Sequence, residues 1–270
     1  MSRPVVRAAI FGLAAFAVAA ALRREDRKPL RTPRLPAHRR QFDNLILGAG
    51  SLLAAQVVQR QLLAPLLEAD AGRCGAVRLL PASIRPVAAF LALDWAMYWW
   101  HRATHRVPLL WRLHRVHHVD LDLDMSTAIR FHALDQLVSA PTRAAMILFV
   151  GPDARTHARW NLFFFASVLF HHANVRLPRG LEERLAWVLT TPRMHGIHHM
   201  ARRDATDSNW TSGLSFWDRL HGSFRMDLND EALPIGVPGY PDQLGVAASL
   251  ALPAAPSADD WSSRRSASNM

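Results

Sequence analysis

The sequence contains a single cysteine, Cys74, among its 270 residues, so it can form neither an internal disulfide nor a cysteine-rich metal site. Acidic residues are also scarce: 22 Asp and Glu stand against 32 Lys and Arg, which leaves a formal net charge of +10. A basic balance can indicate nucleic-acid binding, but no motif that reads bases and no aromatic-basic surface pattern accompanies it. We therefore expect no nucleic-acid partner, and the positive charge needs another explanation.

Long apolar runs supply that explanation. Half of the residues are apolar, and arginines separate their runs, which is the pattern of positively charged loops on the cytoplasmic side of a membrane. The first run, Ala8–Leu22, precedes a basic block at residues 23–40. Such a block is hard to translocate, which favours a first membrane helix over a cleaved signal peptide. Further apolar segments follow at Phe42–Pro65, Leu79–Trp100, Leu137–Val150 and Trp160–Phe170.

The last two of these segments are shorter than the roughly 20 residues that a membrane helix needs. They are either tilted short spans or a hairpin that only dips into the bilayer. With residues 23–40 in the cytoplasm, one span out and one back places the loop at 66–78 outside. His101, which follows the third span, then returns to the cytoplasmic side. The predicted protein is thus integral to a bacterial inner membrane or another membrane that faces the cytoplasm.

Histidines occur in three clusters with regular spacing. An HxxxH pair is followed by two HxxHH triplets, and residues three and four apart share one face of a helix. Each cluster can therefore aim its imidazoles at one point, and imidazole is a common ligand of borderline metals. The candidate metal ligands in these clusters are His101, His105, His114, His117, His118, His195, His198 and His199.

The number of histidines indicates two metal ions. A zinc site is satisfied by three or four protein ligands, so eight clustered histidines fit two ions that share a site. Soluble di-iron bundles use Glu together with Glu-x-x-His pairs. Such carboxylates are missing from these clusters, so the predicted site is dinuclear and rich in imidazole.

The motifs HRATH, HRVHH and HGIHH, in this order after DWAMYWWHR, resemble the fatty acid hydroxylase/sterol desaturase superfamily of integral-membrane di-iron oxygenases. The resemblance extends over roughly residues 85–226. It implies an all-α integral membrane protein with about four membrane helices or helical hairpins and a cytosolic histidine-rich helical cap. It also implies a di-iron centre that uses O2 to hydroxylate or desaturate a C–H bond of a lipid. No reductase or cytochrome b5-like domain is visible in the sequence, so a separate electron donor is expected.

Further site residues follow from the same resemblance. FHHAN resembles the family's xHxN element, which makes His172 rather than His171 the expected ligand. In STAIRFHALD, His132 is either an extra ligand or a partner of Asp135, and both readings stay open. DATDSNWTSG, followed by FWDRLHG, resembles the family's segment after the last cluster and marks Asp207 and Asn209 as catalytic candidates. The sequence departs from the family pattern at Thr211 and His221, which stand in the usual positions of Gly and Phe.

Asp94 is a third catalytic candidate, one or two helical turns before His101. A carboxylate near the end of an apolar helix either pairs with an arginine such as Arg102 or orients a ligand imidazole. The sequence does not decide between these roles.

Three regions follow from the pattern as a whole. Residues 1–78 are expected to hold the N-terminal membrane helices and the basic loop, and residues 79–226 the catalytic domain. Residues 227–270 are rich in Pro, Ala and Ser and are expected to form a disordered cytoplasmic tail. Within the catalytic domain, Leu181–Leu189 reads either as an interfacial helix on the membrane or as a core helix of the cap.

Two other functions use similar histidine patterns. A zinc-dependent membrane hydrolase needs a general-base carboxylate beside HxxxH, as in HExxH, and here Arg102 takes that position. A divalent-metal transporter places His and Asp at mid-membrane along a pathway. Here each cluster begins where an apolar run ends, which favours the oxygenase.

Overall fold

The computed structural model describes residue 25, residues 27–228 and residues 234–261. These parts of the chain contain helices, loops and three isolated bridges, and no β-strand, which confirms the all-α prediction. Four long helices are the main elements of the described chain before residue 175: α2 (Ala37–Val58), α4 (Arg85–Arg106), α6 (Ala133–Val150) and α7 (Ala154–His172).

The long helices coincide broadly with the predicted apolar segments. α2 continues through a π-helical turn, η1 (Gln59–Leu63), into α3 (Ala64–Glu68), so the second predicted span is one continuous helix. The third span is shifted: a 3-10 turn, η2 (Ala76–Leu79), comes first, and α4 begins only where a proline occupies its first turn. The first predicted span, Ala8–Leu22, lies outside the described residues.

The two short apolar segments extend into helices of 18 and 19 residues. Their N-terminal ends were missed because the first turns are polar. The side chain of His132 accepts a hydrogen bond at the start of α6, and Asp153 does the same at the start of α7. Such caps satisfy amide groups that the first helical turn leaves free, so each helix begins several residues before its apolar run.

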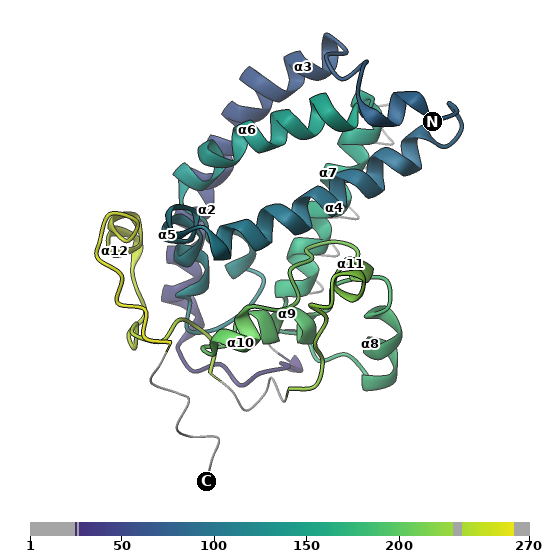
Figure 1. Ribbon diagram of the computed structural model, residues 1–270. Coiled ribbons are helices and arrows are strands. Elements are labelled where there is room, and N and C mark those ends of the chain that lie inside the picture. Colours follow the sequence, from purple (N-terminus) through teal and green to yellow (C-terminus); the bar gives the residue numbers. More distant parts are fainter. Residues whose placement is uncertain (1–24, 26, 229–233, 262–270) are drawn as a thin grey trace, which may run out of the picture.

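Figure 1 shows how the helices are arranged. α2 packs along α6, and α4 packs against α7 and against α5 (Pro108–His118). The short helices gather at one end of the long ones, below them in this view. They are α8 (Arg179–Leu185), α9 (Pro192–His198), α10 (Arg203–Thr206) and α11 (Phe216–Leu220).

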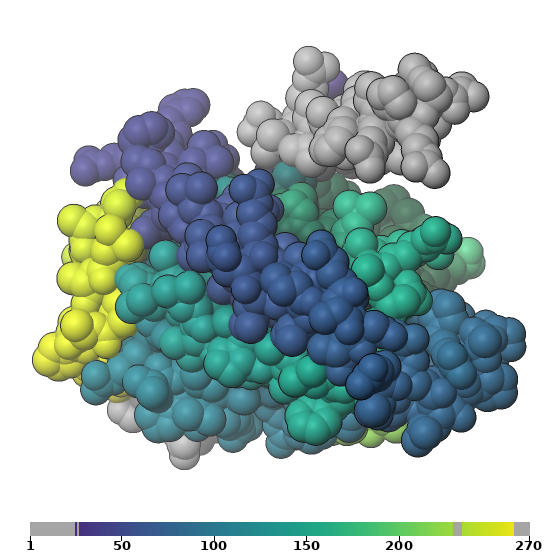
Figure 2. Space-filling model, turned by 90° about the horizontal axis from the view of Figure 1, so that it is seen from above, coloured from purple at the N-terminus to yellow at the C-terminus, as the bar shows by residue number. Residues whose placement is uncertain are grey.

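The long helices expose large apolar side chains on their outer faces, and α2 and α6 lie across the face seen in Figure 2. By length and composition, α6 is the one helix in the described part that could cross a membrane. The predicted set of about four membrane helices therefore stays a prediction. Among the exposed residues are Phe42, Leu45, Leu53, Val57, Val87, Leu137, Phe149, Leu162 and Phe165.

The predicted interfacial helix is shorter than expected. α8 ends at Leu185, and the chain then turns before Leu189. Leu181, Trp187 and Val188 are nevertheless exposed. Contact of this region with a membrane surface stays a prediction.

The prediction of a disordered tail is wrong for residues 234–261. This C-terminal segment contains helix α12 (Val246–Ala251), and Val237 and Leu252 pack with Trp111 of α5 in a common core cluster. In Figure 2 the segment, drawn in yellow, lies against the body of the molecule. Its sequence is poor in long apolar runs, so its few anchoring residues gave no recognisable pattern.

The position of α6 predicts on which side of the membrane Cys74 lies. α6 begins beside Phe131, whose ring stacks on His117, and ends at Gly151, which closely approaches Gly75 next to Cys74. At about 1.5 Å per residue, this helix separates the two ends by nearly the thickness of a bilayer core. A membrane-impermeant maleimide should therefore label the exposed Cys74 from outside the cell.

The control uses the opposite end of the molecule. Asp242 is exposed in the C-terminal segment, so a D242C variant that also carries Cys74→Ala should be labelled only after the membrane is permeabilised. Labelling of both positions from the same side would contradict this topology.

Candidate metal centre

The turn between α4 and α5 brings two histidine clusters together. Val107 has an extended backbone (φ −93°, ψ 117°), and Pro108 starts α5. A residue before proline is disfavoured in the helical conformation, which ends α4 at this point. The last turns of α4 and the whole of α5 therefore face each other, and the ring centroids of His105 and His118 are 4.6 Å apart.

The remaining candidate ligands come from α7 and α9, which pack against each other. Thr191 caps α9 through its side chain, and Pro192 occupies the first turn. This short helix carries the second HxxHH. Its ring contacts reach both α5 and α7: the centroid of His199 is 4.7 Å from that of His117 and 5.3 Å from that of His172.

Two groups of four histidines result. In each group the ligand nitrogens all lie within 4.8 Å of one another, and every member is buried. The first histidine group is His101, His105, His114 and His118, and the second histidine group is His117, His172, His195 and His199. The two predicted ion sites thus share α5, because the first HxxHH contributes to both groups.

His198 lies beside the first group without being one of its four members. Its ring centroid is 4.7 Å from those of His101 and His105. Its Nδ1 lies 2.8 Å from the carbonyl oxygen of Ser208, while its Nε2 is buried without a partner. The ring is therefore oriented as a metal ligand would be, with one nitrogen held by the backbone and the other free.

The same orientation occurs in both groups. Nδ1 of His101 lies 2.7 Å from the carbonyl oxygen of Trp210, and Nδ1 of His172 lies 2.8 Å from that of Val168. A carbonyl can only accept, so each Nδ1 carries the proton and Nε2 keeps its lone pair. Lone pairs directed inwards are what a metal ion requires.

The spacing of the nitrogens also fits an ion. In the second group, Nε2 of His172 is 3.1 Å from Nε2 of His117 and 3.1 Å from Nε2 of His195. His195 and His199 are joined by the same Nε2–Nε2 distance of 3.1 Å. Two nitrogens bound to one ion at about 2.0–2.1 Å lie roughly 3.0–3.4 Å apart, so these four nitrogens have the separation of ligands around a common centre.

Several buried nitrogens of the two groups have no hydrogen-bond partner at all. Both nitrogens of His105 and His114 and Nε2 of His118 are in this state. Buried polar atoms without partners are rare in proteins, because each one costs about 1–3 kcal/mol. Their concentration in one place is explained if they bind metal ions.

Burial also fixes the protonation state of the histidines. It lowers the pKa of His118, His195 and His199 well below the ordinary value, and neighbouring imidazoles lower it further. The rings are thus neutral near pH 7, and neutral imidazole is the form that binds metal. Neither group contains a carboxylate or a cysteine.

Asp94 takes neither of the two roles that the sequence left open. Its Oδ2 accepts hydrogen bonds from the amide of Leu214 and from Nε1 of Trp217, both at 3.0 Å. The guanidinium of Arg102 lies instead over the ring of Trp99. Asp94 therefore joins α4 to the chain around α11 and supports the site at a distance.

Asp207 and Asn209 also have structural partners. Asp207 pairs with Arg203 and Arg106 at 3.1 and 3.3 Å. Asn209 has a positive φ of 51°, and its side chain donates to the carbonyls of Met194 and Arg225 at 2.8 Å. Both residues shape the loop that supplies backbone carbonyls to the histidines, and a catalytic role for either stays a prediction.

His132 and His171 lie outside both groups. His132 caps α6 through its Nδ1, which accepts from the amide of Leu134, and its contact with Asp135 is a backbone bond, in which the amide of Asp135 donates to the carbonyl of His132 at 2.9 Å. His171 is fully buried, with its ring centroid 4.0 Å from that of His195. The structure thus places His172, and not His171, among the converging nitrogens.

The two departures from the family pattern are accommodated locally. The hydroxyl of Thr211 bonds to the buried carboxylate of Asp218, which also accepts the amide of Trp210 at 2.8 Å. His221 accepts a hydrogen bond from Nε1 of Trp95 at 2.9 Å and stacks on Tyr98. Neither residue belongs to the histidine groups.

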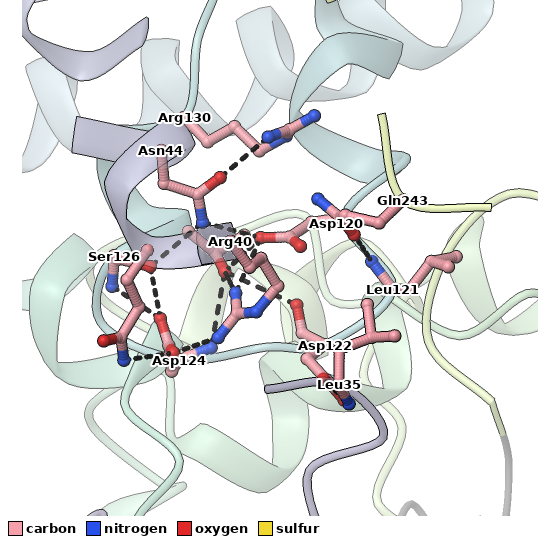
Figure 3. A network of polar contacts seen from close by, with 12 residues as sticks. Leu35, Arg40, Asn44, Asp120, Leu121, Asp122, Asp124, Ser126, Arg130 and Gln243 are labelled. Atoms are coloured by element: carbon pink, nitrogen blue, oxygen red, sulfur yellow. Dashed lines mark hydrogen bonds and ion pairs between the residues drawn. The ribbon is translucent and has the colours of Figure 1, made fainter. Parts of the chain in front are cut away.

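A polar network holds the loop that follows α5, and Figure 3 shows it. Arg40 of α2 pairs with Asp120 at 3.0 Å and with Asp124. Asn44 donates to Asp120 at 2.9 Å and accepts from Arg130 at 2.7 Å. The Nε of Arg130 in turn donates to the carbonyl of Val116 in α5 at 3.0 Å. The C-terminal end of α5 is therefore tied to α2 by side chains that belong to neither histidine group.

Three aromatic residues beside the histidines were not anticipated from the sequence. Trp210 packs on His105 and His198, Trp111 packs on His105 and His118, and Phe131 stacks on His117. An aromatic residue at such a position reads as ordinary core in a sequence. Only the folded contacts show that these rings pack against the imidazoles.

The geometry predicts which histidines are needed for metal. His198→Ala and His117→Ala should each lower the metal content of the purified protein by about one ion per chain, because each removes an inward-facing nitrogen from a buried site. His38→Ala is the matched control, since His38 is exposed in α2. Mass spectrometry of bound metals measures the result; a full complement of metal in both variants would refute the paired-ion interpretation.

His171 and His172 provide a second comparison within one helix. His172→Ala should lose metal from the second group, whereas His171→Ala should keep both ions, because only His172 has its Nε2 among the converging nitrogens. Metal content decides between them. If His171→Ala instead loses metal and His172→Ala keeps both ions, the metal centre remains as described, but His171 takes the place of His172 as a ligand.

Comparison with known proteins assigns the family. The model of the fatty acid hydroxylase family matches residues 86–223, just over half of the 270 residues. Human alkylglycerol monooxygenase is 32% identical over 141 residues, which are 52% of this chain and 30% of that protein. The ornithine lipid hydroxylase OlsE of Rhizobium tropici is 27% identical over 159 residues, 59% of this chain and 47% of its own length.

A sterol desaturase gives a longer match. The Delta(7)-sterol 5(6)-desaturase erg3B of Aspergillus fumigatus is 27% identical over 212 residues, 74% of this chain and 58% of its own length. The chain thus spans less than two thirds of each of these relatives. No solved structure matches it. The matched region includes every histidine of the two groups, and the chain belongs to the fatty acid hydroxylase family.

Proposed function

We propose that this protein is a membrane-bound di-iron oxygenase that hydroxylates or desaturates a C–H bond of a lipid. The observation that carries this proposal is the pair of buried histidine groups, eight neutral imidazoles without a carboxylate or thiolate among them. Membership of the fatty acid hydroxylase family supports iron as the metal. A di-iron centre, when bound, supplies the activation of O2 and the abstraction of hydrogen.

The chain itself holds the ions, orients their ligands and keeps water out. The two groups and His198 hold the ions. The carbonyls of Trp210, Val168 and Ser208 fix the tautomers of three ligands, which stabilises the ring orientation that a metal needs. The aromatic rings of Trp111, Trp210 and Phe131 cover the imidazoles and make the surroundings apolar, so that reactive oxygen species are kept from water.

Hydroxylation needs electrons from outside the site. Insertion of one atom of O2 into a C–H bond, with the other atom leaving as water, consumes two electrons and two protons. Desaturation removes two hydrogens and also consumes two electrons when O2 is reduced fully to water. We therefore propose that a separate electron-donor protein supplies these electrons.

The membrane location is part of the same proposal. The exposed apolar side chains of α2, α4, α6 and α7 suit contact with lipid, and the histidines lie where these helices end. A site at this position can receive a C–H bond of a lipid that remains in the bilayer. We place the histidine groups on the cytoplasmic side, the side that the positive charge of the basic block at residues 23–40 favours.

The relatives suggest the kind of lipid. Alkylglycerols, ornithine lipids and sterols, which the relatives' names specify, share a long or bulky apolar body with a small polar end. We propose a substrate of this type. A zinc hydrolase is less well supported, since Asp94 and Asp207 are engaged elsewhere and no carboxylate lies in either group.

The proposal predicts both metal and product. Protein purified in detergent should contain about two irons per chain, and cells that express it under ¹⁸O2 should form a lipid with one ¹⁸O atom or with a new double bond. Comparison with the His198→Ala variant in the same cells controls for other oxygenases. Two zinc ions per chain together with a hydrolysed lipid would instead identify a hydrolase.

A further inference from the structure

The C-terminal segment, residues 234–261, lies beyond the part of the chain that the family model matches, which ends at residue 223. It nevertheless packs against both helices that carry HxxHH. Its contacts with α5 are made through Trp111 and Arg115, and its contacts with α9 are made through the backbone next to His199. The segment therefore contacts both helices next to the histidines of the candidate metal centre.

Arg115 is the main anchor on α5. Its side chain is fully buried, and its Nη2 donates to the carbonyls of Leu252 and Ala255 at 2.7 and 3.0 Å. These carbonyls follow the last turn of α12, where a helix leaves acceptors without partners. Nη1 donates to Ser257 and to the hydroxyl of Tyr240. One guanidinium of α5 therefore contacts the end of α12, the chain that follows it and Tyr240.

Asp259 joins this anchor to a second one. Its Oδ2 accepts a hydrogen bond of 2.6 Å from Nε1 of Trp111, and its Oδ1 lies 3.4 Å from Nη1 of Arg115. Trp111 and Arg115 are four residues apart and so lie on the same face of α5. A single carboxylate thus fixes the rotation of the Trp111 ring and contacts the guanidinium of Arg115.

The Trp111 ring connects this carboxylate with the first histidine group. Its centroid is 5.0 Å from that of His105 and 5.5 Å from that of His118. The side chain is nearly buried, at 8% exposure. Since His105 has no hydrogen-bond partner at either nitrogen, packing against Trp111 and its other neighbours is what holds its ring in place.

The contact with α9 is made by the backbone. The amide of Gly236 donates to the carbonyl of His199 at 3.0 Å, and the amide of Ala201 donates to the carbonyl of Pro234 at 2.8 Å. Gly236 has a φ of 116°, a conformation that other residues rarely adopt. The start of the segment is therefore built to lie against the end of the second HxxHH.

We propose that the C-terminal segment is a positioning element of the metal centre, in which Asp259 acts through Trp111 and Arg115 to hold the ligands of the first histidine group. The inference depends on the proposed metal-binding function. It assigns selective work to Asp259: Trp111 contacts histidines of the first group, so the ion held there depends on this carboxylate and the ion in the second group does not.

The test compares three substitutions in the full-length protein. Asp259→Ala removes the acceptor for both Trp111 and Arg115, and Asp259→Asn keeps an oxygen that can accept from Trp111. Asp242→Ala is the control, an identical change at an exposed position of the same segment. The rate at which bound metal passes to a chelator is followed in detergent, and thermal unfolding is measured in parallel.

In the wild type and in Asp242→Ala, both ions should leave slowly. In Asp259→Ala, one of the two ions should leave about tenfold faster, the lower end of the effect of residues that support metal ligands, while the other keeps its rate. Asp259→Asn should restore most of the slow release. Such a selective, rescuable change is not expected from a general loss of stability.

Two results would overturn the inference. One is release of both ions from Asp259→Ala at the wild-type rate. The other is an equal increase in the release rates of both ions together with a lowered unfolding temperature, which would show a merely structural role. The proposed function fails in a different way. If a metal other than iron co-purifies, the di-iron proposal is wrong, while the release experiment with that metal still decides the role of Asp259.

Discussion

The structure depends on one constraint: nine imidazoles, those of the two histidine groups and His198, are buried together with many of their nitrogens unpaired. Each such atom costs roughly 1–3 kcal/mol in the absence of a partner, and the sum rivals the whole stability of a domain. Metal binding removes this cost. Folding of this end of the molecule and loading with metal are therefore expected to be linked.

This constraint explains why many hydrogen bonds and ion pairs surround the histidine groups but do not involve the inward-facing nitrogens. Asp94, Asp218 and Asn209 each tie a loop to a helix behind the histidines. Arg40 and Arg130 fasten the end of α5 to α2 and to the loop that follows it. His101, His172 and His198 place Nδ1 against backbone carbonyls. Orientation is thus supplied from the outside, which leaves the inward nitrogens free for ions.

Sequence spacing was sufficient for the parts of this arrangement that follow from helical periodicity. It predicted the helical class, the core of each long helix and the residues that form the two groups. It did not predict how the histidines divide between the two groups. His117 belongs to the second group, whereas His114 and His118 belong to the first, because α5 lies between two sets of partners. It also missed the order of residues 234–261, since that order depends on Arg115, one buried cation that binds two backbone carbonyls and the side chains of Tyr240, Ser257 and Asp259.

Membrane topology does not explain all of the excess of arginines. Arg40, Arg115 and Arg130 are almost completely buried, so part of the positive excess is internal structure and not a cytoplasmic surface. A guanidinium has five donors and no acceptor, and it remains charged. It can satisfy carbonyls and carboxylates next to a metal centre without ever competing as a ligand. The nearby carboxylates, Asp94, Asp120 and Asp218, accept bonds from such donors, amides and indoles, which keeps them from replacing imidazole at the ions.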